Sequence, residues 1–230
     1  MFFDPYYFLY IAPALVLAFW AQMRVKSTFA AAQKVHTSLS GAAAARHILD
    51  SAGLQNVAIE QVAGHLSDHY DPRDKVLRLS QDVFGARSAA AVGIAAHEAG
   101  HALQDAQNYA PLVLRNGAVP AATFGGNASM IMLIAGMLLS PKIPALGILV
   151  PLGIAAFACV VVFQLINLPV EFNASARAKR LLVDHGIVAT DDMVYVNRVL
   201  NAAAWTYVAA TLQAVLTLLY YIMRFYGNRD

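Results

Sequence analysis

Four long apolar stretches constrain this chain more than any other feature of its sequence. They cover about residues 6–22, 118–139, 144–168 and 202–223. Each approaches or exceeds the ~20 residues that an α-helix needs to cross the hydrocarbon core of a bilayer. Hydrophobic residues make up 59% of the chain and charged residues 13%, against about 45–50% and about 25% in soluble domains. We therefore predict a mainly α-helical membrane protein with four spans.

Two polar segments, about 23–117 and 169–201, alternate with these stretches. Four crossings place both segments on one side of the membrane and the turn at Lys142 on the other. Basic residues near the spans are more numerous in the polar segments, which favours the cytoplasmic side. We expect a single domain over residues 1–230, in a multi-pass protein of the bacterial plasma membrane with its active site facing the cytoplasm.

Charge and cysteine content exclude several classes of protein. The formal net charge is +2, and no run of Lys or Arg forms a phosphate-binding stripe, so we expect no nucleic-acid partner. The only cysteine is Cys159, which excludes a disulfide within the chain and a cysteine-rich zinc site.

The first polar segment predicts a small mixed α+β unit. Ser40 can cap a helix that ends near Gly53, and Ser88 can cap a longer helix from residue 89 to about 107. Between them, apolar residues in 57–62 and 76–79 favour two strands, with turn residues at 71–74, as in a small hairpin or sheet.

The second polar segment predicts two helices. Pro169 suits the first turn of a helix that Gly186 would end. Thr190 suits the start of a further helix that continues into the last apolar stretch without a break.

The helix after Ser88 carries the segment His97-Glu98-Ala99-Gly100-His101. Residues four apart lie on one helical face, so His97 and His101 can bind one zinc ion together. Glu98 then lies beside the metal, where its carboxylate can take a proton from a metal-activated water. This pattern predicts zinc-dependent hydrolysis of peptide bonds, with Glu98 as the general base.

A catalytic zinc ion needs a third protein ligand. Glu171 is the leading candidate, because a carboxylate on an apolar stretch at the end of a span needs a charged partner. His65, His69 and His185 are the competing candidates, although a loop position explains the first two and a helix C-terminus explains His185.

Three segments, HEAGHALQ, LPVEFNASARA and SDHYDPRDKVLRLS, together resemble the YugP-type membrane zinc metallopeptidases. More distantly, they are similar to the HtpX-type heat-shock proteases and the CAAX prenyl proteases. The resemblance covers nearly the whole chain and implies one Zn²⁺ ion, the ligands His97, His101 and Glu171, and the catalytic residue Glu98. The HtpX-type pattern has an aspartate where this chain has Ser175, so we expect Asn173 or Ser175 to orient a ligand histidine.

The sequence leaves two further functional roles unassigned. A separate donor should stabilise the oxyanion of the reaction, and Arg177, His185 and Tyr207 are the candidates. The segment VLRLS, residues 76–80, is a candidate edge strand to which a peptide could add by backbone pairing.

We therefore expect a four-span helical membrane protein with a small α+β, zincin-like unit at the membrane face. Its expected function is zinc-dependent endopeptidase activity on membrane-associated or misfolded polypeptides, so its partners are a polypeptide substrate and the lipid bilayer. The alternative is a catalytically silent, metal-stabilised membrane scaffold or binding protein, against which the intact Glu98 argues. A transporter is disfavoured because the spans lack repeated charged residues.

Overall fold

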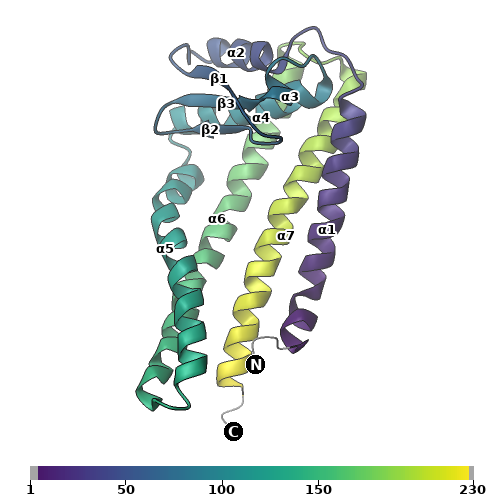
Figure 1. Cartoon of the computed structure of the whole chain (residues 1–230). Helices are drawn as coiled ribbons and strands as arrows, with labels where there is room; N and C mark the ends of the chain where they lie inside the picture. The colour runs from purple at the N-terminus through teal and green to yellow at the C-terminus, as the bar shows by residue number, and fades with distance from the viewer. Residues whose placement is uncertain (1–4, 228–230) are drawn as a thin grey trace. The chain divides into compact units, whose positions relative to one another are not determined.

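The computed structural model describes residues 5–227 and is mainly helical (Figure 1). The α-helices are α1 (Pro5–Ala32), α2 (Gly41–Ser51), α3 (Gln81–Phe84), α4 (Ala89–Ala106), α5 (Ala110–Leu139), α6 (Leu149–Asp184) and α7 (Met193–Tyr226). Two 3₁₀ turns, η1 (Pro144–Ile148) and η2 (Thr190–Asp192), precede α6 and α7, and the strands are β1 (Ala58–Val62), β2 (His69–Asp71) and β3 (Val76–Ser80).

Four helices are long and apolar enough to cross a membrane, as the sequence predicts: α1, α5, α6 with η1, and α7. Each is longer than its apolar stretch, because the helix continues into the neighbouring polar segment. The expected helix start at Pro169 is wrong, since Pro169 lies inside the continuous helix α6. A proline in a helix interior removes one backbone hydrogen bond but does not by itself end a helix of this length.

The chain divides into two compact units. The apolar unit contains Met1–Phe19, Leu114–Pro169 and Thr206–Asp230, and the polar unit contains Trp20–Val113 and Val170–Trp205. The boundaries between the units fall inside the four long helices. A single domain over the whole chain stays a prediction.

Small residues let α5 and α6 pack closely within the apolar unit. A Cβ atom at Gly125 would lie 2.6 Å from the carbonyl oxygen of Ala156, and a Cβ at Gly136 would lie 2.7 Å from Val150 Cγ2. Large apolar side chains remain on the outside of this unit, as in Phe124, which is 75% exposed. An exposed apolar surface of this kind is what a lipid-solvated helix requires.

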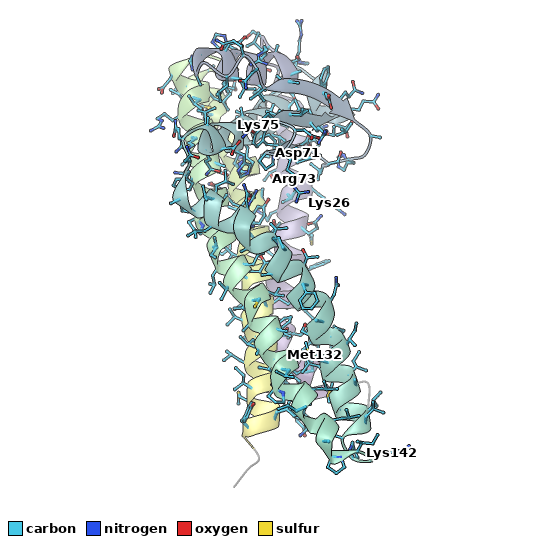
Figure 2. The ribbon with its side chains drawn as sticks, turned by 90° about the vertical axis from the view of Figure 1, so that its left-hand side faces the viewer. Lys26, Asp71, Arg73, Lys75, Met132 and Lys142 are labelled. Atoms are coloured by element: carbon cyan, nitrogen blue, oxygen red, sulfur yellow. The ribbon has the colours of Figure 1, made fainter. Side chains whose placement is uncertain are left out.

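The polar unit contains a three-stranded sheet with strand order β1-β3-β2. β1 pairs parallel with β3, and β2 pairs antiparallel with it. The turn at residues 71–74 therefore joins β2 to β3, and the segments predicted as strands do not form a hairpin with each other. Figure 2 labels Asp71, Arg73 and Lys75 at this turn. The hypothesis that VLRLS is an edge strand is wrong, because β3 is the central strand and both of its edges are paired.

Helix α4 lies at the centre of the polar unit, where it contacts α2, α3, β2 and β3. Fourteen of its 18 residues are buried, and most of these are alanine or glycine, which allow the neighbouring elements to approach closely. The caps agree with the sequence. Ser40 accepts a hydrogen bond from the backbone N–H of Ala43, and Ser88 accepts one from Ala91. Gly53 and Gly186 have positive φ angles of 75° and 60° just after α2 and α6.

Candidate metal centre

His97, Glu98 and His101 lie in the middle of α4, among its buried alanine and glycine residues. The two histidines are four residues apart, and their rings lie 4.8 Å apart between centroids at an interplanar angle of 87°. Glu98 and His101 are buried, with exposed fractions of 9% and 7%. A helix of small residues therefore carries three ionisable side chains into the interior of the unit.

Glu171 reaches the same place from α6 and is only 5% exposed. The approach of α6 to α4 depends on Gly100, because a Cβ atom there would lie 2.8 Å from the carbonyl oxygen of Ala174. Gly100 lies inside the motif, directly before His101. Its missing side chain is what allows the helix with Glu171 to lie against the helix with the histidines.

His97, His101 and Glu171 form a cluster whose potential ligand atoms all lie within 4.8 Å of one another. Glu171 Oε2 lies 3.2 Å from His97 Nε2 and 3.5 Å from His101 Nε2. Zinc bonds of 2.0–2.1 Å at tetrahedral angles place two ligand atoms about 3.4 Å apart. The two distances from Glu171 Oε2 match this value, and the distance between the two histidine nitrogens is within 4.8 Å, so the cluster is consistent with a site for one zinc ion.

The second nitrogen of each imidazole ring has a partner of its own. His97 Nδ1 lies 3.1 Å from the hydroxyl of Ser175, and His101 Nδ1 lies 2.9 Å from Oε1 of Gln104. A histidine that binds a metal through Nε2 carries its proton on Nδ1, where it can donate a hydrogen bond. Both rings are therefore oriented as metal ligands require.

Glu98 points toward strand β2. Its Oε2 accepts a hydrogen bond of 3.1 Å from the backbone N–H of Tyr70. The Tyr70 hydroxyl donates a hydrogen bond of 2.7 Å to Asp105, about two helical turns after Glu98 on α4. Burial raises the pKa of the Glu98 carboxyl to about 7 against an opposing contribution from His97, and the charges of Glu171 and Asp68 raise it further by smaller amounts. A dication bound at the neighbouring cluster would lower this pKa, so the carboxylate would be ionised and able to accept a proton at neutral pH.

The three histidines that compete with Glu171 have other partners. His65 Nδ1 pairs with Asp82 at 2.7 Å, and His69 Nδ1 lies 2.8 Å from the carbonyl oxygen of Ser67. His185 lies 3.2 Å from the Ser51 hydroxyl and packs against the ring of His47. Among residues 5–227, Glu171 is the side chain that joins the two motif histidines.

Asn173 and Arg177 lie on the Gln104 side of the cluster. Asn173 Oδ1 accepts hydrogen bonds from Gln104 Nε2 at 3.0 Å and from Arg177 Nε at 2.6 Å. Arg177 also donates to Gln107 at 2.6 Å. Tyr207 belongs to the apolar unit, where its carbonyl oxygen accepts from the Thr211 hydroxyl at 2.9 Å. Arg177, His185 and Tyr207 remain predictions as oxyanion donors.

Gln104 is the residue at this site that the sequence analysis did not single out. It is fully buried, and its side chain contacts His101, Asn173 and the backbone of Val170. The available signal was its spacing, because His97, His101 and Gln104 follow at intervals of four and three residues and so share one helical face.

Comparison with known proteins agrees with this site. The sequence model of the family described as "Putative neutral zinc metallopeptidase" matches residues 7–226. The chain belongs to this family. It is 47% identical over 225 residues to the "Putative membrane protease YugP" of Bacillus subtilis (strain 168), and the alignment covers 97% of each chain. No solved structure matches the chain.

Membership of the neutral zinc metallopeptidase family gives the cluster a chemical meaning. Two imidazole nitrogens and one carboxylate oxygen are a common ligand set of catalytic zinc, which keeps a fourth position open for water or substrate. The His97, His101 and Glu171 cluster is consistent with such a site. The family description, the membrane protease relative and the four long apolar helices agree on a membrane zinc metallopeptidase.

Proposed function

We propose that this chain is a zinc-dependent endopeptidase that cleaves peptide bonds at the cluster of His97, His101 and Glu171. The observation that supports it most strongly is the pair of distances from Glu171 Oε2 to His97 Nε2 and His101 Nε2, 3.2 and 3.5 Å. Glu98 lies on α4 with the two histidines. One zinc ion held there would polarise the scissile carbonyl and acidify a water molecule.

Glu98 is the proposed general base. Its carboxylate takes a proton from the attacking water and then delivers that proton to the leaving amine. Tyr70 holds this carboxylate through a backbone N–H, which leaves the tyrosine side chain free to anchor β2 to Asp105 on the same helix. The Ser175 hydroxyl accepts a hydrogen bond from the Nδ1–H of His97 and so keeps that ring in the ligand orientation.

We further propose membrane-associated or misfolded polypeptides as substrates. The polar unit carries features of a membrane–water boundary: Trp20 and Trp205 pack edge to face at 5.8 Å between centroids, and the Arg24 guanidinium lies 6.0 Å from the Trp20 ring. Tryptophan is enriched at such boundaries, and basic residues are frequent in the cytoplasmic segments next to the ends of spans. A site in the same unit is therefore suited to segments that lie at the membrane surface.

The orientation in the membrane has its own test. Lys142 lies in the turn between α5 and η1 and is exposed (Figure 2). In a variant with Cys159→Ala and Lys142→Cys, an impermeant maleimide should label the new cysteine in intact cells if the polar unit faces the cytoplasm. Labelling that requires permeabilised cells would reverse the proposed orientation.

The decisive experiment uses the purified full chain in nanodiscs, with zinc analysis and cleavage of an unfolded casein as readouts. Glu98→Gln should keep its zinc and lose cleavage, because the amide cannot take a proton. Glu171→Ala should lose zinc, because one of three ligands is removed. Glu60→Gln is the matched control, since Glu60 is an exposed glutamate of β1 in the same unit.

Two outcomes would contradict this assignment. Cleavage by Glu98→Gln at the wild-type rate would exclude Glu98 as the base. Wild-type zinc content in Glu171→Ala would exclude Glu171 as the third ligand. A wild-type protein that binds zinc but cleaves neither casein nor a reconstituted single-span polypeptide would favour the scaffold alternative.

A further inference from the structure

We propose that Gln104 is a positioning residue that sets the tautomer of His101 and couples it to the helix segment carrying Glu171. This inference rests on the proposed metal site and extends it to a residue outside the motif. The Gln104 side chain is fully buried, so water does not compete for its polar atoms.

The orientation of the Gln104 amide follows from its surroundings. Its Nε2 lies 2.9 Å from the backbone carbonyl oxygen of Val170. A carbonyl oxygen can only accept, so the amide nitrogen must face Val170. The amide oxygen then faces His101 Nδ1, at 2.9 Å.

The protonation of His101 follows in turn. The Gln104 oxygen can only accept a hydrogen bond, so His101 Nδ1 must carry the proton that it donates. In a neutral imidazole, Nε2 is then unprotonated and presents its lone pair. This is the nitrogen that lies 3.5 Å from Glu171 Oε2, on the side where the metal would bind.

The same amide also fixes the position of α6. Gln104 Nε2 donates to Val170 and, at 3.0 Å, to Asn173 Oδ1, so its two contacts fall on either side of Glu171 in the sequence. Arg177 donates to Asn173 Oδ1 at 2.6 Å and holds that acceptor in place. One buried side chain therefore orients a ligand on α4 and aligns the carrier of another ligand on α6.

The matching partner of His97 is Ser175, which provides an internal comparison. Ser175 lies on α6 and contacts Nδ1 of His97 alone, whereas Gln104 lies on α4 and contacts Nδ1 of His101. Loss of either residue should disturb one ring and leave the hydrogen bond of the other ring intact.

The test measures zinc affinity of the full chain in detergent by competition with a chelator, and the Nδ1–H signals of ¹⁵N-labelled histidines in the zinc-loaded protein by NMR. Gln104→Met keeps the approximate size of the side chain and removes its three hydrogen bonds, to His101, Val170 and Asn173. It should weaken zinc binding by about 10–100-fold, as for other partners of ligand histidines. It should also shift or remove one of the two Nδ1–H signals, and Ser175→Ala should affect the other.

Ser88→Ala is the matched control, because Ser88 caps the same helix at its far end and touches no ligand. It should lower the stability of the protein and leave zinc affinity within about twofold of wild type. The comparison distinguishes a general destabilisation of α4 from a specific effect on His101. If Gln104→Met does not fold, Gln104→Glu carries the test, since its carboxylate still accepts from Nδ1 and should keep the His101 signal.

The proposal is overturned if Gln104→Met binds zinc within about twofold of wild type, or if the His101 Nδ1–H signal is unchanged in it. Loss of that signal in Gln104→Glu would overturn it as well. These readouts do not use peptide cleavage. An absence of endopeptidase activity would therefore refute the proposed function without affecting the assignment of Gln104.

Discussion

Gly100→Ala should separate the two helices that carry the proposed zinc ligands. The added Cβ would lie 2.8 Å from the carbonyl oxygen and 3.3 Å from the Cα of Ala174. Ordinary van der Waals contact between such atoms begins at about 3.4 Å. Helices α4 and α6 must therefore move apart by roughly 0.6 Å along this line. The obstructing atoms belong to the backbone of a long helix, which cannot move aside as a side chain can.

The expected effect on stability is the difference between two opposing contributions. Overpacking of a close contact costs about 1–3 kcal/mol. Replacement of glycine by alanine inside a helix contributes about 1 kcal/mol in the opposite direction. The free energy of unfolding should therefore fall by at most about 2 kcal/mol, and the variant should still fold.

The same displacement should have a marked effect on zinc affinity. His101 follows Gly100 directly, and Glu171 lies one turn before Ala174 on α6. Metal sites tolerate about 0.2 Å of change in ligand distances, so a separation of roughly 0.6 Å should weaken zinc binding at least about 10-fold. Zinc affinity by chelator competition and thermal unfolding of the purified protein measure the two effects.

Gly93→Ala is the matched control for this variant. Gly93 lies in the same helix, and a Cβ there would meet Val196 Cγ1 at 3.2 Å, a side chain that can shift without moving the backbone. This variant should keep wild-type zinc affinity. Equal zinc affinity in the two variants would refute the argument that Gly100 sets the distance between the ligand helices.

Three further predictions concern metal, pH and a partly buried acid, Asp68. Zinc at 100 times its dissociation constant should raise the free energy of unfolding by about 2.7 kcal/mol, and Glu171→Ala should abolish this increase. Chemical unfolding of each protein with zinc and without it measures the difference. The rate of cleavage should fall on the acid side below pH 7, because the pKa of Glu98 is about 7 without a cation and a bound dication lowers it; an acid limb above pH 7 would contradict this. Burial raises the pKa of the Asp68 carboxyl above 3.8, although it accepts hydrogen bonds from Ser80. The unfolding free energy that Asp68 contributes is therefore greatest below pH 3.8 and decreases as the pH rises through its folded pKa. Asp68→Asn should gain stability relative to wild type over that range, and a constant difference between unfolding curves at low and neutral pH would show that Asp68 is not responsible.

The features that the sequence predicted well depend on neighbours along the chain. Hydropathy over about 20 residues identifies a span, because each helix in lipid satisfies its own backbone. Ser40, Ser88, Gly53 and Gly186 mark helix ends through contacts within one turn. The spacing of His97 and His101 places two rings on one face for the same reason.

The errors in the fold arose where a residue's role depends on distant partners. Pro169 was expected to begin a helix, but α6 already extended through it from the span before. The segment VLRLS is a candidate edge strand from the sequence, but β1 and β2 pair with its two sides. Local propensity identifies a strand and does not determine which strands lie beside it.

The composition of the site divides in the same way. The motif on α4 supplies two candidate ligands and a candidate base by helical periodicity alone. The third candidate ligand, Glu171, lies 74 residues after His97, on α6. Glu171, rather than His65, His69 or His185, completes the cluster because α6 approaches α4 at Gly100. Gln104 became significant only when that approach placed Val170 and Asn173 against its amide. The sequence by itself determined which side chains can do this chemistry, and the packing of two helices decided which of them meet, because ligand geometry depends on distances that no local pattern encodes.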